Sequence, residues 1–236
     1  MRQPTNSASL SLLKSLLKTN ISYVIDVGVQ YGTPFLMDEL PDTFHYLIEP
    51  VQLYHESIIT NYTNLGIPFE LIKAAASDTE GVLNQHMQCL DGSGKITHSQ
   101  LLENKITSME GLVEIVQTPV ITLDNHFTKI DKYIVKIDVD GIEEKIIQGG
   151  INTIKNALVV FLESPLTKIS SRVKILETLG MRLFDITDIC YYHNQLQQVD
   201  LVFVNSNIIH SNLDFHPFKK FEKIDWSEWE KLVLPC

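Results

Sequence analysis

Short apolar runs alternate with longer amphipathic segments along most of the chain. After the first 20 residues, each run of about five apolar positions is followed by a stretch with helical spacing. Strands that alternate with helices in this way are typical of a parallel sheet with helices on both faces. The runs predict strands over residues 23–27, 44–48, 69–76, 133–139, 158–162 and 201–204, and the amphipathic segments predict helices over residues 34–40, 51–64, 141–156 and 169–179.

The last two predicted strands are joined differently. Residues 181–186 form a further apolar run, and only the polar stretch 188–200 separates it from the run at 201–204. Two strands with no helix between them pair antiparallel, as a hairpin. We therefore expect an α/β fold whose parallel sheet ends in an antiparallel hairpin.

Three segments lie outside this alternation. Residues 1–20 place leucines at helical spacing and contain no acid, and we expect an amphipathic helix packed on the domain rather than a transit peptide. Residues 84–112 are polar and show no sustained period, which is typical of a lid or substrate-binding loop. Residues 211–236 contain Trp226 and Trp229 at helical spacing and predict a C-terminal cap on the domain.

Composition and charge narrow the class of protein. Apolar residues make up 44% of the 236 and charged residues 20%, enough apolar material for a globular core. No stretch reaches the ~18 apolar residues that a membrane span needs. With 19 basic and 29 acidic residues the net charge is −10, so we expect no nucleic-acid partner, because binding to phosphates depends on basic side chains. Three distant cysteines without a CxxC motif are typical of a reducing compartment, and we expect a cytoplasmic protein.

Acidic and small residues follow the first three predicted strands. Asp26 and Gly28 end the first strand, Gly32 follows, and Glu49 ends the second strand 23 residues after Asp26. An acid at that spacing can accept both hydroxyls of a ribose. The glycines let the backbone turn tightly beside a ligand, although the dinucleotide fingerprint GxGxxG is absent. The third strand ends in small residues that would either leave a flat slot for an adenine or form an ordinary turn: Ala76, Ser77 and Asp78.

The most specific motif runs from Lys136 to Glu143, in the sequence KIDVDGIE. On a helix that begins at residue 141, Glu143 falls on the apolar stripe together with Ile151, whereas Glu144 falls on the wet face. A carboxylate on an apolar stripe needs a partner or a position at the rim of a cleft. Glu144 is explained by the helix dipole alone, and Glu143 is therefore the candidate functional acid.

Taken in this order, the motifs resemble those of the FkbM family of S-adenosylmethionine-dependent methyltransferases. The segments that carry the resemblance are residues 136–143 with Gly149–Gly150 (the family's KIDxEGxE…GG stretch), 121–124 (its TLD segment), 47–50 (its acidic EP corner), and 75–78 with Gly81 (its ALSD…G turn).

The resemblance implies a Rossmann-like class I methyltransferase fold over residues 21–210. This fold has a seven-stranded, mostly parallel sheet with a terminal antiparallel hairpin and helices on both faces. The implied cofactor is S-adenosyl-L-methionine, and the implied reaction is in-line transfer of its sulfonium methyl to a hydroxyl of a sugar, glycan or small metabolite. The implied cofactor contacts are Asp26, Gly28 and Gly32 at the methionine end, Glu49 at the ribose, and Ala76, Ser77 and Asp78 at the adenine.

Catalysis of this kind rests on alignment and on removal of the hydroxyl proton. Asp138 lies at the carboxyl end of a strand, where ligands bind in open α/β sheets, and is a candidate both for the base and for a cofactor contact. Glu143 and His193 complete the candidate catalytic set, and His98 is a further histidine candidate. Carboxylates at positions 138 and 140 would also suit magnesium, but we expect no metal site.

Two other functions stay open at this point. A binding protein that keeps the fold but has lost catalysis is favoured by the bulky Val29 and Gln30, which stand where the family commonly has alanine and asparagine. A nicotinamide-dependent oxidoreductase on a similar sheet is disfavoured by the missing fingerprint glycines.

Overall fold

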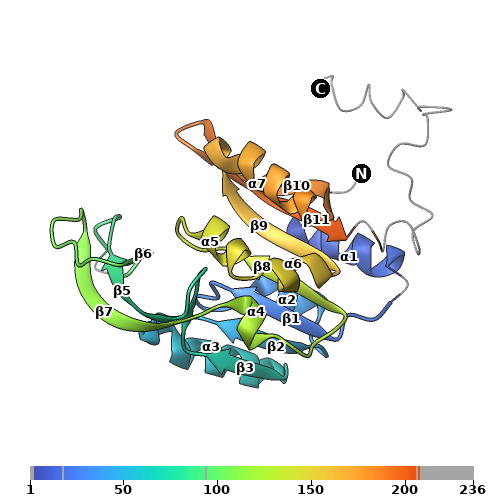
Figure 1. Ribbon diagram of the computed structural model, residues 1–236, viewed down its shortest axis with the longest axis horizontal. Helices are drawn as coiled ribbons and strands as arrows, with labels where there is room; N and C mark the ends of the chain where they lie inside the picture. Colours follow the sequence, from blue (N-terminus) through green and yellow to red (C-terminus); the bar gives the residue numbers. More distant parts are fainter. Residues whose placement is uncertain (1–2, 18, 94, 206, 208–236) are drawn as a thin grey trace.

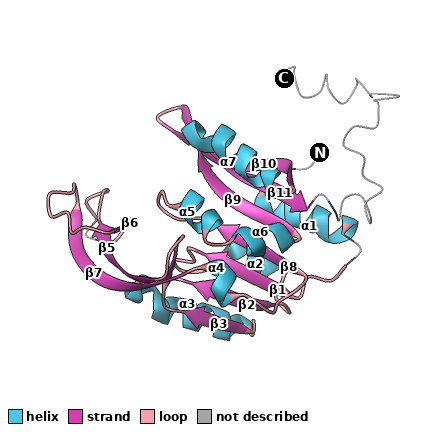
Figure 2. Ribbon diagram, in the orientation of Figure 1, coloured by secondary structure: helices cyan, strands magenta, loops and turns pink. Residues whose placement is uncertain are grey.

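A seven-stranded sheet forms the centre of the molecule (Figures 1 and 2). The computed structural model describes residues 3–17, 19–93, 95–205 and 207. The strands of this sheet are β1 (Tyr23–Val27), β2 (Phe44–Ile48), β3 (Phe69–Ile72), β8 (Tyr133–Ile137), β9 (Val159–Pro165), β10 (Met181–Tyr192) and β11 (Gln195–Asn205). Their order is β10–β11–β9–β8–β1–β2–β3. Neighbours from β9 to β3 pair parallel, and β11 pairs antiparallel with β9 and β10. The predicted fold, with its terminal hairpin, is confirmed.

Helices cover both faces of the sheet. On one face lie α1 (Asn6–Leu16), α2 (Pro34–Glu39) and α3 (Gln52–Leu65), and on the other lie α4 (Leu123–His126), α5 (Glu143–Gln148), α6 (Ile151–Asn156) and α7 (Ile169–Thr178), which follows a 3₁₀ turn at Leu166–Lys168. Side chains alternate across a strand, so neighbouring residues of β1 reach different layers. Val24 belongs to the core layer that contains Leu10 of α1, whereas Ile25 belongs to the layer that contains Ile146 of α5.

A second, smaller sheet lies where the sequence predicts an irregular segment. Its strands are β4 (Ala75–Ala76), β5 (Gly81–Gln88), β6 (His98–Leu102) and β7 (Leu112–Ile121), in the order β4–β7–β5–β6. In Figure 1 this sheet extends away from one end of the central sheet. Buried polar side chains replace the apolar alternation: Gln85 accepts a hydrogen bond from Thr118 and donates one to Ser99.

The helix predicted over residues 141–156 is divided into two. It breaks at Gly149 and Gly150, between α5 and α6. A Cβ atom on Gly149 would lie 2.0 Å from the carbonyl oxygen of Ser77, so only glycine lets the two segments pass this closely. Beyond the break the helical phase changes, and Ile151, which the sequence predicts on the buried stripe, is 45% exposed.

The terminal hairpin is longer than predicted. β10 and β11 run through the polar stretch 188–200 and turn at His193 and Asn194, whose φ angles are 49° and 61°. The outer half of the hairpin is exposed, and its apolar side chains Ile189, Tyr191 and Tyr192 lie on the surface, so no alternation of buried and exposed positions marks it in the sequence.

Two expectations concern the ends of the chain and membranes. The predicted cap over residues 211–236, with Trp226 and Trp229, lies outside the described residues. Within the described part of the chain, no helix has both the length and the apolar character needed to cross a membrane.

Candidate active site

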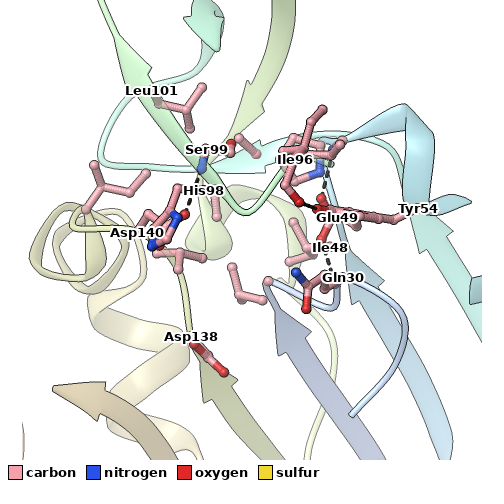
Figure 3. A pocket seen from close by; sticks show the side chains of 18 of the residues that line it. Gln30, Ile48, Glu49, Tyr54, Ile96, His98, Ser99, Leu101, Asp138 and Asp140 are labelled. Carbon is pink, nitrogen blue, oxygen red and sulfur yellow. Dashed lines mark hydrogen bonds between the residues drawn. The ribbon is translucent and has the colours of Figure 1, made fainter. Parts of the chain in front are cut away.

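A cavity opens at the carboxyl ends of the central strands, beside the turn between β1 and α2 (Figure 3). It measures about 900 Å³ with its open mouth included, which lies within the size range of ligand pockets. From β1 the sheet is extended in one direction by β2 and β3, and from β8 it is extended in the opposite direction by β9, β11 and β10. The strand order therefore reverses between β1 and β8, and the cavity lies at this point. Ligands bind at this point in open α/β sheets.

Gly28 forms the floor of the cavity. Its φ angle is 83°, and a Cβ atom there would lie 1.8 Å from the backbone oxygen of Asp138. The turns after β1 and β8 can therefore meet only through a glycine. Gly32 has a different role, because a Cβ atom there would lie 3.0 Å from the sulfur of Met37, and Gly32 does not line the cavity.

Glu49 lines the cavity at the end of β2 and is only 4% exposed. Its Oε2 accepts the N–H of Gln30 at 2.8 Å, and its Oε1 accepts the N–H of Val51 at 2.8 Å. Burial raises the pKa of Glu49, and these two N–H groups partly offset that rise. Each carboxylate oxygen has a further lone pair, so Glu49 can accept hydrogen bonds from two ligand hydroxyls.

Lys136 joins two carboxylates of neighbouring strands. Its Nζ lies 3.5 Å from Oδ1 of Asp26 and 3.1 Å from Oδ2 of Asp138, and it donates to the oxygen of Gly28 at 3.1 Å. Burial would lower the pKa of Lys136, but the two carboxylates outweigh this and raise it, so the ammonium stays charged. Asp26 is fully buried, finds no hydrogen-bond donor among the described residues and does not line the cavity. Its link to the cavity wall is the ion pair with Lys136.

Two hydrogen-bonded carboxyl groups face the cavity from adjacent strands. Asp138 follows β8, and Glu163 belongs to β9. Burial and the charge of Asp138 raise the pKa of Glu163 to about 9. For Asp138, burial acts in the same direction, but Lys136 and the bond to Glu163 outweigh it and lower the pKa. The two carboxyl groups therefore titrate together, and burial and mutual repulsion favour retention of one proton by the pair.

The second sheet is held over the cavity by two hydrogen bonds from opposite sides (Figure 3). Tyr54 of α3 donates its hydroxyl to the oxygen of Ile96 at 2.9 Å. The N–H of Ser99 donates to Oδ2 of Asp140, in the turn after β8, at 2.7 Å. His98, a predicted candidate, lies between these contacts and lines the cavity.

The structure brings part of the predicted cofactor set together. Gly28, Glu49, Ala76 and Asp138 all line the cavity, whereas Asp26, Gly32, Ser77 and Asp78 do not. The N–H of Ser77 bonds to the oxygen of Ile121, and its hydroxyl donates to Asp78. These two side chains support the turn after β4 rather than the cavity wall.

Two predicted catalytic residues also lie outside the cavity lining. Glu143 is 1% exposed, and its Oε2 lies 2.6 Å from Nη2 of Arg172, so its position on an apolar stripe is explained by a buried ion pair. Arg172 also donates to the backbone oxygen of Glu163, which ties the pair to the cavity wall. His193 is exposed at the hairpin tip, with its ring 4.3 Å from that of Tyr192.

Glu163 is a cavity acid that the sequence reasoning missed, and Tyr54, Ile96 and Ser99 also line the cavity without having been predicted. The apolar run predicts a strand only to residue 162, while β9 continues to residue 165. The available signal was an acid directly after an apolar run, the same signal that identified Glu49. No group of three or more histidine, cysteine, aspartate or glutamate side chains in the described ranges is arranged to hold a metal ion.

The fold and the cavity define a Rossmann-like methyltransferase of class I. The chain belongs to the FkbM methyltransferase family, because the model of the methyltransferase FkbM domain matches residues 26–186, more than half of the sequence. The cofactor of this family and fold is S-adenosyl-L-methionine. No protein among those with curated descriptions matches the sequence.

Solved structures share the fold at low sequence identity. The METTL16 methyltransferase domain matches with a TM-score of 0.50 and 11% identity, over 85% of this chain and 68% of that one. An rRNA methylase from Streptococcus thermophilus has a TM-score of 0.49 and 10% identity, over 84% of this chain and 93% of that one. A putative tRNA (m1A22) methyltransferase from Streptococcus pneumoniae, solved with S-adenosyl-L-methionine, has a TM-score of 0.45 and 12% identity, over 95% and 86%.

These comparisons correct the prediction about partners. From the net charge of −10 we excluded nucleic acid and expected a small-molecule or glycan acceptor. That prediction was wrong, because solved structures that match this chain include enzymes named as RNA methyltransferases. Net charge sums the whole chain and does not describe the surface that an acceptor contacts, so it could not exclude this class of partner.

Proposed function

We propose that this chain transfers the sulfonium methyl group of S-adenosyl-L-methionine to a hydroxyl oxygen of its acceptor. The observation that carries the proposal is the charge of the cavity. Its lining includes four acids, Glu49, Asp138, Asp140 and Glu163, and among the described lining residues there is no lysine or arginine. Such a wall attracts a cationic nucleoside and repels the pyrophosphate of a nicotinamide cofactor.

The lining residues fit the cofactor part by part. Glu49 offers acceptors to the two ribose hydroxyls, at the position that binds ribose in related nucleotide folds. Ile48 and Ala76 provide an apolar wall beside it for the adenine. The backbone of Gly28 and the carboxylates of Asp138 and Asp140 surround the methionine end. Gln30 lines the cavity but uses its N–H to hold Glu49, so it supports the ribose site.

The proposed chemistry needs alignment and a proton acceptor. The bound cofactor supplies an electrophilic methyl carbon on a positively charged sulfur. Asp138 lines the cavity with a half-exposed side chain and accepts the proton of the acceptor hydroxyl. Lys136 fixes the Asp138 carboxylate from the buried side, at 3.1 Å. The second sheet, held by Tyr54 and Asp140, limits the entry of water that would compete with the acceptor.

Isothermal titration calorimetry tests the cofactor site. Wild-type protein is titrated with S-adenosyl-L-methionine and compared with Glu49→Gln. Hydrogen bonds to a charged group contribute about 1.5–3 kcal/mol, so we expect affinity to fall at least about tenfold. Glu56→Gln is the matched control, because Glu56 is exposed on α3 and does not line the cavity. No cofactor binding by the wild type would exclude the proposed function.

The acceptor atom is tested separately by mass spectrometry of methylated products. The panel contains hydroxyl-bearing acceptors, both RNA and saccharides, each paired with an analogue that lacks the hydroxyl. We expect methylation of the hydroxyl form and none of its deoxy analogue, and a large fall in kcat for Asp138→Asn. Methylation of nitrogen or carbon atoms would show that the transfer is not to oxygen.

A further inference from the structure

The hydrogen-bonded carboxyl pair is the least expected feature of the cavity. Glu163 is fixed on three sides: its Oε1 accepts from the amide of Gln198, its backbone oxygen accepts from Arg172, and its carboxyl group bonds to Asp138. Two carboxyl groups can share a hydrogen bond only if one of them keeps a proton. Ile137 of β8 and Leu162 of β9 are paired in the sheet register, so the next residues, Asp138 and Glu163, bring their carboxyl groups together at the cavity wall, where one retained proton relieves their repulsion.

No nearby cation is available to replace this proton. Lys136 is already engaged by Asp26 and Asp138, and Arg172 by Glu143 at 2.6 Å and Glu144 at 3.5 Å. The charged groups that face Glu163 from the surrounding strands and helices are Asp138, Asp200, Glu143, Lys136 and Arg172. Acids outnumber cations in this set, so an ionised Glu163 lacks a compensating charge.

We propose that the positive charge of the bound cofactor takes the place of the shared proton. Binding of S-adenosyl-L-methionine, a cation, releases the proton of the Asp138–Glu163 pair to solvent and leaves two carboxylates facing the sulfonium. The acceptor hydroxyl then returns one proton to the pair. This inference rests on the proposed function for its cofactor and acceptor.

The charges balance through the cycle. In the transfer step the acceptor oxygen forms a bond to the methyl carbon, the carbon–sulfur bond breaks, and its electron pair stays on sulfur as a neutral thioether. The hydroxyl proton passes to the Asp138–Glu163 pair. The site thus loses the sulfonium charge and regains its proton together, and the pair returns to the singly protonated state of this structure. The neutral product, S-adenosylhomocysteine, has no sulfonium to displace that proton.

Proton release on binding is measured by isothermal titration calorimetry at pH 7.5, in phosphate and in Tris, which differ in ionisation enthalpy. We expect wild type to release close to one proton with S-adenosyl-L-methionine and clearly less with S-adenosylhomocysteine. Glu163→Gln, which imitates the protonated side chain, binds the cofactor but releases almost none. Glu144→Gln, the matched control outside the cavity lining, behaves as wild type.

A second measurement does not depend on variants. Because binding and protonation compete, the Kd of wild type for S-adenosyl-L-methionine falls up to tenfold per pH unit between pH 7 and 9, with a weaker dependence for S-adenosylhomocysteine. Binding without proton release, or equal release in wild type and Glu163→Gln, would overturn this inference and leave the proposed function intact. Absence of any cofactor binding would instead refute the proposed function.

Discussion

Replacing Glu143 with glutamine tests whether this residue acts through a buried ion pair. Both partners are 1% exposed, and the contact between Glu143 and Arg172 is 2.6 Å. Removing one member of such a pair costs about 3–5 kcal/mol, because the remaining charge is left buried. The glutamine oxygen can still accept one hydrogen bond, so we expect a loss of about 3 kcal/mol. The adjacent change, Glu144→Gln, is the control: Glu144 lies 3.5 Å from Arg172 with a 22% exposed side chain, and we expect below ~1 kcal/mol.

Urea and thermal unfolding measure both variants. For a chain of this size each kcal/mol shifts Tm by about 2–4 °C, so Glu143→Gln should lower Tm by roughly 6–12 °C. Because Arg172 also donates to the backbone of Glu163, cofactor affinity should fall in Glu143→Gln and stay near wild type in Glu144→Gln. Equal and small shifts in the two variants would refute the assignment of Glu143 to a buried pair.

Three further predictions follow from contacts around the cavity. Gly28→Ala should abolish measurable cofactor binding in calorimetry, since its Cβ atom would lie 1.8 Å from a backbone oxygen. Gly66→Ala is the control: Gly66 has a φ of 70° but no atom within 4 Å of an added Cβ, so this variant shows the effect of backbone strain without the clash. Tyr54→Phe removes the bond to Ile96 and should speed hydrogen exchange of β6 amides while costing about 1 kcal/mol of global stability; unchanged exchange would show that the bond does not hold the sheet. The pKa of Glu163 is raised to about 9 in the folded state, so the folded protein holds a proton that the unfolded chain has lost. Wild-type stability should therefore fall as pH rises from about 4.5 towards 9, and urea titrations of Glu163→Gln should show a shallower fall; parallel slopes would contradict the assigned proton.

The centre of the fold could be predicted from the sequence because its strands are buried on both faces. The apolar runs at residues 23–27 and 44–48 coincide with β1 and β2, since every residue of such a strand needs an apolar or partnered side chain. Strand-end acids then marked the cavity, because the carboxyl ends of parallel strands meet at one edge. Glu49 and Asp138 were located in this way.

The second sheet could not be predicted because its interior is polar. Asn84 and Gln85 are buried yet bonded to side chains and backbone of neighbouring strands, so no period of two in hydrophobicity reveals β5. The break at Gly149 depends on a contact with Ser77, which lies 72 residues earlier in the chain. Contacts of this kind are set by tertiary packing, and no local pattern encodes them.

The attachment of the second sheet has a consequence for how this family's specificity can be altered. Ala75 and Ala76 of β4 pair with Val120 and Ile121 of β7. The two ends of the segment that forms the second sheet therefore lie next to each other. Residues 77–119 lie between these paired ends, and replacing them need not disturb the register of the central strands. A graft of the corresponding segment from a relative would replace the strands that cover the cavity while Gly28 and Glu49 stayed in place.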